Sequence, residues 1–89
     1  MNRGKILHIG AGSLIRLTEI VGIFDLDKTT YGKKTREFLT KAEKAGQVIS
    51  AGNELPKSFI VCKEKGKTTV YLSQLAAATL QKRIENLKQ

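Results

Sequence analysis

The chain has 89 residues, 40% of them hydrophobic and 27% charged, a composition typical of one folded domain over residues 1–89. Sixteen lysines and arginines against eight acidic residues give a net charge of +8, which favours a polyanionic partner such as DNA, RNA or an anionic surface. A single cysteine and a single histidine exclude an intrachain disulfide and a zinc site built from those residues.

The same composition predicts the compartment. No run is long enough to cross a membrane, and the first residues lack the apolar core of a signal peptide. A lone cysteine suits a reducing environment. We therefore expect a cytoplasmic protein without a membrane partner.

The most informative stretch covers residues 6–25 and reads ILHIGAGSLIRLTEIVGIFD. Apolar alternation punctuated by glycines predicts a β-meander, with strands over residues 5–9 and 13–25 and no helix. The Gly-Ala-Gly turn resembles the opening of a dinucleotide-binding fold. However, Ile15 stands where that fold needs a third glycine, and strands follow instead of a helix. We therefore interpret the turn as part of a hairpin.

A central helix is predicted from residue 31 or 33 to Ala45. The hydroxyls of Thr29 and Thr30 are candidate caps for its start, and Gly46 is placed to end it in the left-handed conformation. Apolar residues at helical spacing form one narrow stripe, while lysines, arginine and glutamates occupy the other faces. The stripe contains Phe38, Leu39, Ala42 and Ala45.

The second half predicts strands over residues 47–50, 58–63 and 68–72. Cys62 lies in the most apolar of these and is expected to be buried or half-buried. A hairpin turn over residues 64–67 joins the last two strands, and Ser73 caps a final helix over residues 74–87. The order β-β-β-α-β-β-β-α indicates an α+β fold, a small antiparallel sheet with two helices.

Several short motifs, in this order, are similar to those of the extracellular matrix regulatory proteins RemA and RemB. They are IGAGSLIRLTEIVGIFD, the helix end at Ala45-Gly46, the strand SFIVC and the closing TLQKR. The resemblance covers about residues 5–83 and is closer to the B type, on IVGIFD, on PKS before an apolar strand, and on VYLS. It implies a transcriptional regulator of biofilm matrix genes in a Gram-positive bacterium. It also implies a homo-oligomer, a ring, that presents a basic surface to double-stranded DNA.

The chain departs from the A type at the positions that the resemblance associates with DNA. That type has an arginine after the second strand and an arginine pair in the loop before the SFIVC-like strand. Here Thr18 or Glu19 stands at the first place, and Glu54 and Leu55 stand at the second. The A-type contacts therefore do not carry over directly to this chain.

The leading hypothesis is a DNA-binding regulator that neutralises backbone phosphates with lysine and arginine. The candidate contacts are Arg16 and Lys57, expected in loops, and Lys33, Lys34 and Arg36 near a helix N-terminus. The alternative is a non-catalytic, oligomeric interaction module that regulates through protein partners without binding DNA. RNA binding suits the charge but lacks exposed stacking aromatics. An enzyme is not expected, nor a cofactor or a small-molecule substrate, because no catalytic or phosphate-binding motif is present.

Overall fold

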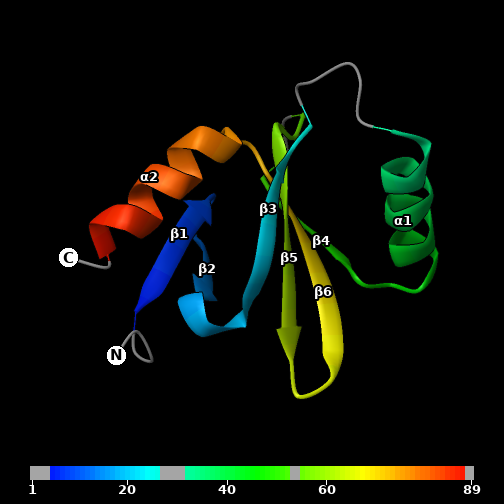
Figure 1. Cartoon of the computed structure of the whole chain (residues 1–89), viewed down its shortest axis with the longest axis horizontal. Coiled ribbons are helices and arrows are strands. Elements are labelled where there is room, and N and C mark those ends of the chain that lie inside the picture. Colours follow the sequence, from blue (N-terminus) through cyan, green and yellow to red (C-terminus); the bar gives the residue numbers. More distant parts are fainter. Residues whose placement is uncertain (1–4, 27–31, 53–54, 88–89) are drawn as a thin grey trace.

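The computed structural model describes residues 5–26, 32–52 and 55–87, and these form three layers (Figure 1). In the middle is a sheet whose strands lie in the order β3 (Ile20–Asp25), β5 (Ser58–Glu64), β6 (Lys67–Ser73) and β4 (Val48–Ala51). Helix α1 (Lys33–Lys44) covers one face. The hairpin of β1 (Ile6–Gly10) and β2 (Ser13–Arg16) covers the other together with α2 (Ala77–Leu87). The predicted α+β class, with two helices and six strands, is confirmed.

The central strand β5 is buried from both sides because a layer covers each face of the sheet. Its Ile60 and Cys62 belong to the larger core, which the β1–β2 hairpin and α2 complete with Leu7, Ile9, Ile15 and Leu80. Phe59 belongs to the smaller core, with Ala42 of α1 and Val70 of β6. Alternate residues of β5 thus belong to two different cores, because successive side chains of a strand point to opposite faces of the sheet. This explains why SFIVC is apolar without alternation.

The prediction of a β-meander over residues 6–25 was wrong. β1 and β2 do form an antiparallel hairpin, but they make a separate two-stranded sheet. A short 3₁₀ helix, η1 (Leu17–Glu19), then redirects the chain, and β3 pairs with β5 instead of β2. Three apolar runs in succession look alike locally, and only the distant partner β5 decides which sheet each of them joins.

The sheet is also not antiparallel throughout, which corrects a second expectation. β4 runs parallel to β6, with Val48 opposite Val70 and Ala51 opposite Ser73. Helix α1 causes this arrangement, because it carries the chain from β3 at one edge of the sheet to β4 at the other. The remaining pairs, β3–β5 and β5–β6, are antiparallel as expected.

Helix α1 follows its prediction closely. Ala42 is buried and Leu39 packs on the smaller core, whereas Ala45, at the C-terminal end of the predicted stripe, is exposed. Gly46 takes a φ of 73°, and its N–H donates to the Glu43 carbonyl while the Gln47 N–H donates to the Ala42 carbonyl. These two hydrogen bonds end the helix at Gly46, as predicted. The proposed caps Thr29 and Thr30 lie outside the described residues.

The role predicted for Ser73 was wrong. α2 begins at Ala77, not at residue 74, so Ser73 does not cap it. Its buried hydroxyl donates to the Ile9 carbonyl at 2.6 Å and accepts from the Leu75 N–H at 3.0 Å. Ser73 thereby ties the sheet to β1 and to the approach to α2. The apolar face of α2 packs on the sheet, with Leu80 buried and Ile84 and Leu87 packed on the larger core.

Candidate nucleic-acid interface

Three of the predicted contacts lie together on the first turns of α1. Lys33, Lys34 and Arg36 are all exposed, and the first turn contains no acidic residue. Gly32 precedes the helix in an extended conformation and offers no side chain to cap it. Cations at this end oppose the helix dipole, whose positive end also lies here. The same combination of free backbone N–H groups and positive side chains attracts anions such as phosphate.

Lys57 lies at the same end of the sheet as these helix residues. Its N–H donates to the Ser73 carbonyl at 2.7 Å, and its own carbonyl accepts from the Leu26 N–H at 2.8 Å. The backbone is therefore held on both sides while the side chain stays exposed. The neighbouring Pro56 lines the same hollow, of about 270 Å³, as Arg36. The structure thus brings Lys57 and the α1 cluster to one end.

Arg16 is separate from this group. It is the exposed last residue of β2, paired with Ile6, and not part of a loop as expected. β2 lies in the layer with α2, on the opposite side of the sheet from α1 (Figure 1). One flat contact with a duplex therefore does not engage Arg16 and the α1 cluster of a single chain together.

The bend after Arg16 holds Thr18 and Glu19, at the place where the resemblance led us to expect an arginine in the A type. Thr18 is exposed, whereas Glu19 is half-buried. The charge of Glu19 acts on the thiol of Cys62 in the larger core. Burial, and secondarily the charge of Glu19, raise the pKa of the Cys62 thiol to about 12, so this buried thiol stays protonated. Of the second pair of positions, Glu54 lies outside the described residues, and Leu55 is 88% exposed.

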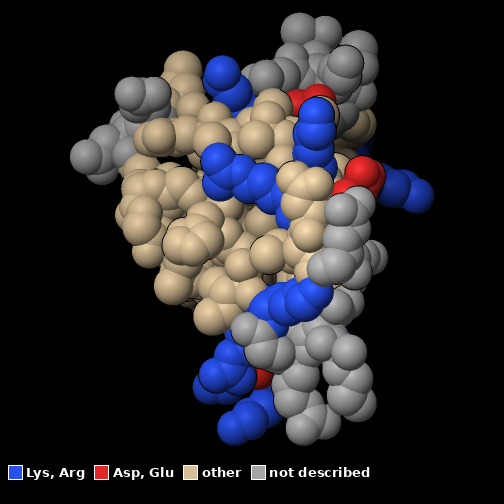
Figure 2. Space-filling view, turned by 90° about the vertical axis from the view of Figure 1, so that its left-hand side faces the viewer, with Lys and Arg blue, Asp and Glu red and all other residues tan. Residues whose placement is uncertain are grey.

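A second basic group was missed by the sequence reasoning. Lys63, Lys65 and Lys67 are all exposed around the β5–β6 turn. The alternation of these lysines through the predicted hairpin turn could have indicated the group, but we interpreted the segment only as a turn. Figure 2 looks at the face that carries β1, β2 and α2, and it shows separate groups of basic side chains above and below a broad area without charge.

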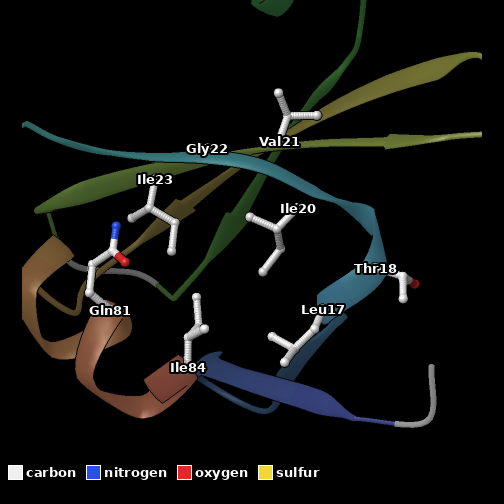
Figure 3. Close-up of a pocket in the computed structure, with 8 residues that line it drawn as sticks. All are labelled: Leu17, Thr18, Ile20, Val21, Gly22, Ile23, Gln81 and Ile84. Atoms are coloured by element: carbon white, nitrogen blue, oxygen red, sulfur yellow. The ribbon is translucent and has the colours of Figure 1, made fainter. Parts of the chain in front are cut away.

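Mainly apolar hollows flank the edge strand β3 on both sides. One, of about 370 Å³, lies between β3 and α2, and Leu17, Ile20, Ile23 and Ile84 point into it (Figure 3). The other, of about 330 Å³, lies between β3 and α1. Its lining contains Val21, Phe24, Lys34, Thr35, Phe38, Phe59 and Val61. Apart from Lys34, which lines the second hollow, these linings suit an apolar protein surface and not phosphate.

Among the described residues, no three His, Cys, Asp or Glu side chains gather where they could hold a metal ion. Within the same residues, no helix has both the length and the apolar character that crossing a membrane requires.

A family model described as RemA-like, extracellular matrix regulatory protein A-like, matches residues 6–84, from the start of β1 into α2. Among curated proteins, none matches the chain significantly. The family resemblance is thereby confirmed, while the closer likeness to the B type stays a prediction.

Proposed function

Because the chain belongs to the RemA-like family of extracellular matrix regulatory proteins, we propose that it regulates matrix genes by binding double-stranded DNA as a homo-oligomer. The observation that carries this proposal is the exposed basic group of Lys33, Lys34 and Arg36, with Lys57 at the same end. Such a group binds phosphates irrespective of sequence and positions the duplex. We propose in addition that the protein acts in the bacterial cytoplasm, where such a target lies.

Self-association would strengthen the binding of DNA beyond what one chain can achieve. Edge strands with exposed apolar side chains are natural sites of pairing between chains. β3 is such an edge, with Val21 66% and Phe24 47% exposed, and hollows lie on both of its flanks. Two different surfaces on one chain suit head-to-tail contacts, which close into a ring. Repeated weak phosphate contacts around a ring add up to an avidity that no single chain has.

The proposal is tested by duplex binding over a range of salt concentrations. Wild type should bind at about 50 mM salt and weaken steeply by about 200 mM. The variant K33Q/K34Q/R36Q should lose about two to three units of the slope of log affinity against log salt, because it releases fewer counterions. A control, K41Q/K44Q/K82Q, removes the same charge from exposed lysines elsewhere and should change the slope less. Equal salt slopes for the two variants would contradict a phosphate-binding role for Lys33, Lys34 and Arg36.

The alternative function is an interaction module that assembles and regulates without touching DNA. The hollows around β3 favour it, as does the half-buried Glu19 near the place of a family arginine. Absence of duplex binding at about 50 mM salt would leave this alternative standing, since phosphate contacts are strongest there.

A further inference from the structure

The β5–β6 hairpin extends past both neighbouring strands. The pairing of β3 with β5 ends at Ile20 opposite Cys62, and the pairing of β4 with β6 begins at Val48 opposite Val70. Beyond these points, β5 and β6 pair only with each other among the described residues. The projecting part, residues 63–68, is called the basic ribbon, and it forms the far end of the sheet in Figure 1.

The basic ribbon is paired up to its turn and positively charged. Lys63 pairs with Thr68 and Glu64 pairs with Lys67, so the register holds up to the turn. Lys65 and Gly66 take φ values of 51° and 82°, the two positive angles of a tight type I′ turn. Three lysines against one glutamate leave the ribbon with a net charge of +2 (3 − 1).

The lysines are arranged on both faces and at the tip. Alternate residues of a strand point to opposite faces, so Lys63 shares the face of Phe59 and Val61, toward α1. Lys67 lies on the opposite face, beside its pairing partner Glu64, and shares the face of Tyr71, toward α2. Lys65 sits in the turn itself. On the β6 side, a hollow of about 540 Å³ separates the ribbon from the α1–β4 turn, which leaves room for a backbone to pass.

We propose that the basic ribbon enters the major groove of duplex DNA tip first, with Lys63 and Lys67 reaching the phosphates of the two groove walls. This inference rests on the proposed function. A two-stranded ribbon fits the B-form major groove, which is about 12 Å wide and about 8.5 Å deep. Three residues beyond Cys62, at about 3.3 Å each, give a projection of about 10 Å. The major groove of A-form RNA is too narrow to admit side chains, so the ribbon selects DNA over duplex RNA.

The test compares K63Q/K67Q with K41Q/K82Q, which loses the same charge from two helices. Both are measured against a DNA duplex, the same duplex with neutral glucosyl groups filling its major groove, and an RNA duplex of equal sequence. The ribbon variant should bind DNA about tenfold more weakly at about 50 mM salt and lose about two units of salt slope, with the control close to wild type. Wild type should bind the filled and the RNA duplexes about tenfold more weakly than plain DNA.

The failures are distinguishable. Equal losses in the two variants, or equal wild-type affinity for the filled and plain duplexes, overturn the ribbon inference and leave DNA binding through α1 standing. If wild type binds no duplex at about 50 mM salt, the proposed function fails and the inference fails with it. All four lysines are exposed, so an unchanged thermal midpoint and oligomeric mass show that each variant remains folded.

Discussion

Ser73 shows how one side chain can join three parts of this small fold. It is fully buried at the end of β6, and its hydroxyl both donates to β1 and accepts from the segment before α2. Ser73→Ala leaves the Ile9 carbonyl and the Leu75 N–H without this partner, so the free energy of unfolding should fall by about 1–3 kcal/mol. Urea unfolding measures this. Exposed Ser50→Ala is the control and should stay within about 0.5 kcal/mol of wild type.

Cys62 links stability to alkaline pH. Burial is the main reason, with the charge of Glu19 second, that its pKa rises from 9.0 to about 12. The unfolded chain loses this proton first, so stability is complete below pH 9 and declines above it. Between about pH 9 and 10 the loss should be about 1 kcal/mol. Urea unfolding across this range checks it: Cys62→Ala should decline less steeply than wild type, and parallel curves would contradict the assignment.

At the scale of the element, the helix and the hairpin were predictable from local sequence, whereas the pairing of distant strands was not. Helical spacing and Gly46 were enough to predict α1, and turn residues were enough to predict the β5–β6 hairpin. The partner of β3 and the direction of β4 were not predictable, because both depend on strands far away in the sequence. Ser73 looked like a cap because serine favours that position, but burial gave its hydroxyl better partners.

The candidate site likewise contains residues whose position follows from local sequence and residues whose position depends on tertiary structure. That Lys33, Lys34 and Arg36 lie at the start of a helix follows from the sequence pattern. That Lys57 joins them depends on backbone bonds to Leu26 and Ser73, which no local pattern contains. Arg16 separates from the group because η1 and the β1–β2 hairpin place it on the other side of the sheet.

At the scale of the whole molecule, the charges and the apolar surface serve different contacts. The two basic groups lie at opposite ends of the sheet, one at the α1 start with Lys57 and one on the basic ribbon. The hollow between β3 and α2 has no charged residue in its lining, whereas Lys34 lines the hollow between β3 and α1. An assembly built through the hollow between β3 and α2 therefore leaves both basic groups exposed. Val21→Glu places a charge on this edge and should reduce the assembly toward the mass of one 9.8 kDa chain, without removing any basic residue.

The measurement that tests the central claim most directly is the mass in solution by light scattering, with and without a DNA duplex, at two salt concentrations. We predict a multiple of 9.8 kDa for the protein alone, and a heavier complex with duplex that forms at about 50 mM salt and dissociates by about 300 mM. A monomer whose mass the duplex leaves unchanged at both salt concentrations would contradict both the assembly and the binding of DNA.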